Sequence, residues 1–191
     1  FYYSHLFVRS ESDYKKLSDL KGKKMSFVSP TSTSGYLFPV ARMVEEGVLE
    51  KGGDPKDFFS DIMYAGGYLQ SFKALLEGQV DVAAADGYAK RMYLDDKQKK
   101  KIRSIAKRGP VPTHLIAIRG GIPDKLKGKV KEALLALNDN SELLKSVYGA
   151  QKLIERGHKE HVGALEKALD RIGKGLTAED IKGEGAGYGS G

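Results

Sequence analysis

The stretch that indicates the fold is residues 24–46, which read KMSFVSPTSTSGYLFPVARMVEE. Residues 24–29 place Met25 and Phe27 among β-favouring neighbours, which is typical of a short strand. Residues 35–46 repeat apolar side chains at spacings of three and four, which predicts a helix. A strand that passes through a short polar loop into a helix is the repeating unit of an α/β domain.

The alternation of strands and helices continues on both sides of this stretch. Strands are expected over residues 1–9, 61–65, 80–85 and 102–107, and within 110–119. Glycine and aspartate mark the helices between them: Gly66-Gly67 leads into one helix, Gly78 ends it, and Asp86 opens the next. The pattern predicts an α/β fold with a mostly parallel sheet.

From residue 123 onward the pattern is helical only. Apolar residues share one helix face between Leu126 and Leu137, and a last long helix is expected over 158–172. Glycine then occupies every second position near the end of the chain, so we expect a flexible tail over 176–191.

Composition excludes several classes of protein. The 191 residues include 40% apolar and 30% charged side chains, which suits a globular protein. The absence of cysteine excludes disulfides, thiolate metal sites and cysteine nucleophiles. The apolar runs are far shorter than the roughly 20 residues that cross a bilayer. Because the chain starts at Phe1 without a leader-like segment, we expect any signal peptide to be missing or already removed.

The formal net charge of +7 raises the question of nucleic-acid binding. Basic residues are densest between Lys97 and Arg108, but no aromatic residue interleaves them to stack on bases. We therefore interpret this segment as a solvated, lysine-rich helix end and expect no nucleic-acid partner.

The loop between the strand and the helix of residues 24–46 is rich in hydroxyl groups. Ser32, Thr33 and Ser34 stand where the free N–H groups of a helix start point outward, and such amides attract anions. Neutral hydroxyl and amide donors suit a tetrahedral oxyanion. The alternative is an ordinary serine cap on the helix.

Two further strand ends add candidates for the same site. Tyr68 follows the strand over 61–65, and Asp86 follows the strand over 80–85. Ligands of open α/β sheets bind outside the carboxyl ends of the strands, so the three loops are expected to converge. The alternatives are a helix cap for Asp86 and a partly buried aromatic side chain for Tyr68.

Enzymatic motifs do not appear. No Gly-Lys-Ser/Thr follows the serine loop, and no Gly-x-Ser-x-Gly is present. His158 and His161 are interpreted as surface residues rather than metal ligands, and His5 and His114 as structural. We expect no metal and no cofactor.

Four segments in order carry a family resemblance: YYS at 2–4, DLKGK at 19–23, STSGYLFP at 32–39 and GQVDVA at 78–83. Together they resemble the phosphonate/phosphite-binding family of ABC-transporter periplasmic solute-binding proteins. The resemblance implies a type II periplasmic-binding-protein-like lobe with C-terminal helices. It assigns residues 1–9 and 110–119 to crossing strands, 10–109 to the second α/β lobe and 120–175 to helices that pack on the first lobe. The half-lobe that precedes the first crossing strand in the family is expected to be missing, or to come from a second chain.

The resemblance also implies a function. Ser32, Thr33 and Ser34 match the positions that hold the phosphonate oxygens, and Asp86 matches an acidic position that meets the protonated or amine-bearing part of the ligand. Tyr68 replaces a histidine that is usual in the family. We expect a periplasmic binding protein, not an enzyme, that carries a small oxyanion to an ABC-transporter permease. The alternatives are the sensor domain of a signalling receptor with the same fold and an enzyme that processes phosphoesters.

Overall fold

The computed structural model describes residues 1–148 and 150–173. The expected flexible tail over 176–191 lies outside the described residues. The described chain divides into two compact units, one formed by residues 1–113 with 162–173 and the other by residues 114–161. Each unit is described by itself.

The first unit is built on one five-stranded sheet with the strand order β3-β2-β4-β1-β5. The strands are β1 (Tyr2–Arg9), β2 (Lys24–Phe27), β3 (Asp61–Tyr64), β4 (Val82–Asp86) and β5 (Ile102–Val111). β2 is parallel to both β3 and β4, and β1 is antiparallel to both β4 and β5. Four of the five strands therefore run in one direction, which confirms the predicted α/β fold with a mostly parallel sheet.

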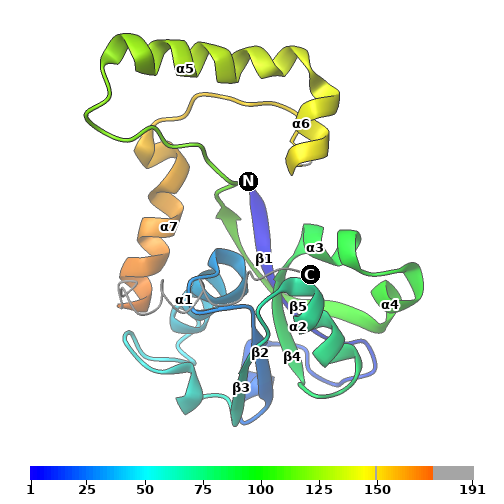
Figure 1. Ribbon diagram of the computed structural model, residues 1–191. Coiled ribbons are helices and arrows are strands. Elements are labelled where there is room, and N and C mark those ends of the chain that lie inside the picture. Colours follow the sequence, from blue (N-terminus) through cyan, green and yellow to red (C-terminus); the bar gives the residue numbers. More distant parts are fainter. Residues whose placement is uncertain (149, 174–191) are drawn as a thin grey trace. The chain divides into compact units, whose positions relative to one another are not determined.

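Helices cover both faces of this sheet (Figure 1). The face with α1 (Phe38–Glu45) also carries the short helices η1 (Leu17–Leu20) and η3 (Pro55–Asp57). The other face carries α2 (Tyr68–Leu76), α3 (Gly87–Tyr93) and the peripheral α4 (Asp96–Lys101). The helix expected over 35–46 begins differently from the prediction, because residues Thr33–Leu37 form a wider π-helical turn, η2, that runs directly into α1.

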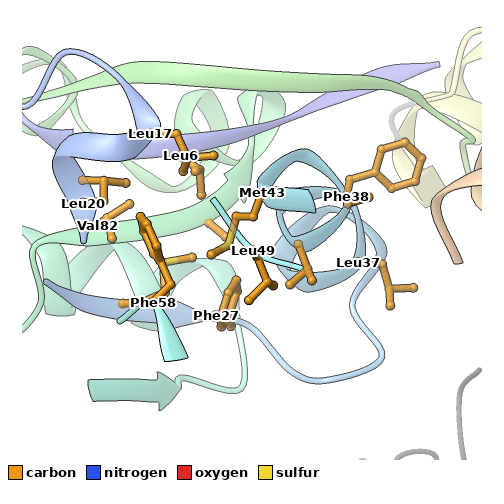
Figure 2. Close-up of a cluster of buried hydrophobic side chains, with 14 of the residues drawn as sticks. Leu6, Leu17, Leu20, Phe27, Leu37, Phe38, Met43, Leu49, Phe58 and Val82 are labelled. Atoms are coloured by element: carbon orange, nitrogen blue, oxygen red, sulfur yellow. The ribbon is translucent and has the colours of Figure 1, made fainter. Parts of the chain in front are cut away.

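The larger core lies between the sheet and α1 (Figure 2). Phe27, Met43 and Val82 have no exposed surface there. A smaller core on the opposite face brings Phe7 against Phe72, with their rings 5.5 Å apart and edge to face. Burial of each large apolar side chain stabilises the fold by about 1.5–3 kcal/mol, so the two cores hold the sheet rigidly between two helical layers.

The last helix, α7 (His158–Ile172), corrects one expectation. The helices over 120–175 were expected to pack on another lobe, but Ala168 and Ile172 are buried in the core beside α1. The backbone N–H of Gly52 donates to the carbonyl of Ile172 at 2.7 Å, which secures the end of the helix. The apolar face of α7 is thus covered by the core of the first unit.

A second correction concerns the strands near residue 110. Separate strands were expected over 102–107 and within 110–119, but β5 is one strand that ends at Val111. It pairs with β1 from Arg9 opposite Ile102 to Tyr2 opposite Val111. The pairing ends at Tyr2 opposite Val111, and residues 112–119 form no strand.

The second unit contains α5 (Asp124–Ala136), η4 (Leu137–Asp139) and α6 (Ser141–Tyr148). The side chain of Asn138 joins η4 to the segment after α6. It accepts a hydrogen bond from the Leu153 N–H at 2.7 Å and donates one to the Leu153 carbonyl at 3.0 Å. Within the described ranges, no helix combines the length and the apolar character that a membrane span requires.

Candidate oxyanion site

The candidate residues lie at one edge of the sheet of the first unit. β2, β3 and β4 are parallel, so their carboxyl ends share this edge. β1 runs the other way, and its Ser4 is the register partner of Asp86. The loops after three strands and the beginning of a fourth strand therefore meet where ligands bind in open α/β sheets.

Ser32 caps the turn that follows β2. Its hydroxyl oxygen accepts from the Gly35 N–H at 3.1 Å, and its carbonyl accepts from the Leu37 N–H at 3.0 Å. A Cβ atom at Gly35 would lie 2.5 Å from Val28 Cγ2, so only glycine lets the turn close over β2. The helix-cap interpretation thus holds for Ser32, while Thr33 begins the turn in a half-exposed position.

Ser34 is fully buried and connects three elements. Its Oγ lies 2.6 Å from the Tyr68 hydroxyl and accepts a long hydrogen bond of 3.5 Å from the Tyr2 hydroxyl. The Ser4 hydroxyl donates to the Ser34 carbonyl at 2.6 Å. The predicted approach of Tyr68 to the serine loop is therefore present, as a direct contact.

Burial dominates the acid–base behaviour of Tyr68 and raises its pKa to about 12. Hydrogen bonds from Ser34 and Ser32 act in the opposite direction, and the charge of Asp86 raises the pKa of Tyr68 further. The pKa of Tyr2 is raised as well, mainly by burial. Both phenols are consequently neutral hydrogen-bond donors at physiological pH.

Asp86 fills the helix-cap role that the sequence offered as one alternative. Its Oδ1 accepts from the Ala89 N–H at 2.5 Å and caps α3. Only 9% of its surface is exposed, and its charge acts on Tyr2, His5 and Tyr68. A buried carboxylate thus lies beside a cluster of neutral hydroxyl groups.

His5 lies next to this cluster on the other face of β1. Its Nδ1 is 2.9 Å from the Ser104 hydroxyl on β5. Burial, followed by the positive charge of Lys107, lowers the pKa of His5, while the charge of Asp86 raises it. A neutral histidine that bridges two strands agrees with the structural role expected from the sequence.

Sequence reasoning missed Tyr2 and Ser4 as site residues. They are two positions apart on β1, so both side chains face the serine loop. Hydroxyl groups at alternate positions near the start of a strand were the available signal. This signal could not be interpreted without the strand order, because the start of β1 lies at the edge of the candidate site only through its pairing with β4.

The arrangement favours binding of an anion through neutral donors. It provides hydroxyl groups on three elements and one carboxylate that can accept a hydrogen bond from a protonated oxygen or an ammonium group. Over residues 1–148 and 150–173, no group of three or more histidine, aspartate or glutamate side chains is placed to hold a metal ion.

A sequence model of the family described as "ABC transporter, phosphonate, periplasmic substrate-binding protein" matches residues 1–160. The chain belongs to this family. It is 30% identical over 136 residues to the "Phosphate-import protein PhnD" of Mycolicibacterium smegmatis. The match covers 68% of this chain and 42% of that relative, so the chain spans about two fifths of the relative's length.

Solved structures show the same fold at low sequence identity. The Xanthomonas citri protein XAC2383, bound to ATP, superposes with a TM-score of 0.75 at 19% identity, over 89% of this chain and 66% of that one. A binding protein component of an ABC phosphonate transporter from Pseudomonas aeruginosa superposes with a TM-score of 0.67 at 20% identity, and the match covers 97% of this chain and 65% of that one. PhnD1 from Prochlorococcus marinus, in complex with methylphosphonate, superposes with a TM-score of 0.69 at 15% identity, and the match covers 91% of this chain and 68% of that one.

Family membership confirms the resemblance inferred from the four sequence segments. The family consists of substrate-binding proteins rather than enzymes, and its description places its members in the periplasm. Such proteins bind small ligands and work with the permease components of ABC transporters.

Proposed function

We propose that this chain binds a tetrahedral oxyanion of the phosphonate, phosphite or phosphate class at the edge formed by Ser32, Thr33, Ser34, Tyr68 and Asp86. In this proposal the chain is part of a solute-binding protein that delivers the ligand to an ABC-transporter permease. The relatives named above support the ligand class, because one is called a phosphate-import protein and another holds methylphosphonate.

The observation that carries the proposal is the hydroxyl contact of 2.6 Å between Ser34 and Tyr68. Ser34 accepts from Tyr2, and in this proposal Ser34 donates its own proton to the Tyr68 oxygen. The Tyr68 proton is then available to an anion outside the cluster. Ser34 thus orients Tyr68, while Thr33, at the half-exposed start of the turn, meets the ligand directly.

Asp86 would select among oxyanions. A carboxylate beside a bound anion repels a fully deprotonated ligand and accepts a hydrogen bond from a protonated oxygen or an ammonium group. We therefore favour monoanions and amine-bearing phosphonates as ligands. Protein outside this chain would cover the anion, because hydrogen bonds gain little where water competes for them.

Calorimetric titration tests the proposal with phosphate, phosphite, methylphosphonate and aminoethylphosphonate as ligands. One hydrogen bond to a charged partner contributes roughly 1.5–3 kcal/mol, so Thr33→Ala should weaken binding by about ten- to a hundredfold. Ser60→Ala, on an exposed serine distant in sequence from the loop, is the matched control and should bind like the parent. Equal affinities for all three proteins would show that the loop only caps a helix.

A turnover assay on phosphoesters separates this proposal from the enzyme alternative. We expect the chain to release no hydrolysis product from any phosphoester. Hydrolysis that disappears in Thr33→Ala would instead assign the loop to catalysis. The sensor alternative binds the same ligands, and a signalling domain in the gene would favour it over transport.

A further inference from the structure

One segment of the first unit carries a charge equal to that of the whole chain. Residues 87–108 contain nine lysine and arginine residues and two aspartates, a net charge of +7, and the formal net charge of the chain is also +7. This segment comprises α3, α4 and most of β5. Part of this charge is used within the chain, since Arg108 pairs with Glu45 and Arg103 donates to the carbonyls of Ser12 and Tyr14. The charge that remains unpaired can attract an anionic partner.

The helix α4 lies entirely on the surface, since none of its residues is buried. Lys97, Lys100 and Lys101 are exposed, and within the described part of the chain none of them forms an ion pair. Lys99 differs, because it pairs with Asp96 at 3.2 Å. Three ammonium groups are thus available to an outside partner.

Large exposed apolar side chains lie on α3, the helix that directly precedes these lysines in the chain. Tyr88, Met92 and Tyr93 of α3 are 47%, 61% and 45% exposed. Tyr88 and Met92 are four residues apart and share a helix face with Arg91, whose guanidinium lies 5.5 Å from the Tyr88 ring. We call Tyr88, Met92, Tyr93, Lys97, Lys100 and Lys101 the α3–α4 surface.

We propose that the α3–α4 surface adsorbs to a membrane surface that contains anionic lipids. Exposed tyrosine and methionine next to clustered lysines are typical of segments that rest in the lipid interface, with lysines on the headgroups. Lysine is depleted from protein–protein interfaces, where arginine is favoured, so the composition argues against an acidic protein. The aromatic residues precede the lysines rather than interleave them, which argues against a nucleic acid.

Co-sedimentation with vesicles tests this proposal on the full 191-residue chain, without any oxyanion. Vesicles of phosphatidylcholine with about one third phosphatidylglycerol should bind the chain, and vesicles of phosphatidylcholine alone should bind it far more weakly. Each lysine near an anionic surface raises partitioning by about fivefold. The triple variant Lys97→Gln, Lys100→Gln, Lys101→Gln should therefore lose most of the binding.

The control is a second triple variant with the same change in charge. Lys15→Gln, Lys21→Gln and Lys56→Gln alter exposed lysines of the same unit outside the α3–α4 surface. Equal losses in the two triple variants would overturn the proposal, because net charge alone would then explain binding. Absence of binding to the anionic vesicles would overturn it as well.

Met92→Ser distinguishes a lipid surface from an acidic protein. Loss of an inserted apolar side chain should weaken vesicle binding severalfold, and this loss should persist at high salt, where the lysine contribution is screened. If Met92→Ser binds vesicles like the parent and soluble polyglutamate displaces the chain, the partner is an acidic polypeptide and the lipid assignment fails.

Discussion

At the scale of the residue, Tyr68 is the side chain on which the candidate site depends most. Its hydroxyl lies 2.6 Å from Ser34 Oγ, and Tyr68→Phe removes the proton proposed to reach the ligand. Affinity for phosphate or methylphosphonate, measured by calorimetry, should fall by about ten- to a hundredfold. Tyr93→Phe, which alters an exposed tyrosine of α3, should leave the affinity unchanged.

The raised pKa of Tyr68 predicts a pH dependence of stability. Its pKa is about 12 in the folded chain and about 10 when unfolded. The unfolded state loses its proton first, so this contribution to stability is fully present below about pH 10 and declines as pH rises toward 12. Urea unfolding on both sides of pH 10 should show a shallower decline for Tyr68→Phe than for the parent. Parallel curves would contradict the burial of this phenol.

Asp86 predicts a pH dependence of binding. Affinity should fall as pH rises through the second ionisation of the ligand, because the carboxylate accepts a hydrogen bond from the protonated ligand and repels the dianion. Asp86→Asn keeps an oxygen for the Ala89 N–H and should flatten the profile, since its amide donates to a deprotonated oxygen. Calorimetry from about pH 5 to about 9 compares the two proteins. Identical profiles would leave Asp86 with its helix-cap role alone.

At the scale of the element, the turn from Thr33 to Leu37 depends on Gly35. An added Cβ would lie 2.6 Å from Val28 Cβ and 2.7 Å from Ser32 Oγ, so Gly35→Ala pushes the turn away from β2 and disturbs the Ser32 cap. We expect a loss of about 1–3 kcal/mol in the free energy of unfolding, with weaker oxyanion binding.

Gly163→Ala is the matched control for the Gly35 prediction. Gly163 lies inside α7, and a Cβ there would meet no atom within 4 Å. Alanine favours a helix interior over glycine by up to about 1 kcal/mol, so this variant should be as stable as the parent or slightly more stable. Chemical denaturation measures both variants. If Gly35→Ala proves as stable as Gly163→Ala, the close packing of the turn on β2 is not present.

At the scale of the whole molecule, Glu45 joins three segments of the first unit that are distant in sequence. It accepts from Arg108 of β5 at 2.9 Å and from Arg171 of α7 at 2.5 Å. These side chains are about a third exposed or less, so solvent weakens the pairs and we expect about 1 kcal/mol for the network. Glu45→Gln should raise amide exchange in the second half of α7 by about fivefold. Asp170→Asn, which removes a highly exposed pair with Lys51, should not.

Local patterns in the sequence determined the elements of the first unit and the family. Apolar spacing predicted α1 and α2, and glycines predicted where helices end. Asp86 could be recognised as the start of α3 because a helix cap involves only the backbone N–H groups two or three residues further on. The placement of Ser34 and Tyr68 at one edge also followed, since parallel strands put their carboxyl ends together.

Tertiary structure alone decided which distant segments contact one another. Tyr2 and Ser4 join the site because β1 pairs antiparallel with β4, and β5 continues to Val111 through its pairing with β1. Ala168 and Ile172 of α7 pack in the core that contains α1, a contact that the apolar spacing of residues 158–172 does not reveal. Pairing and packing across long separations depend on all elements together, so no local pattern encodes them.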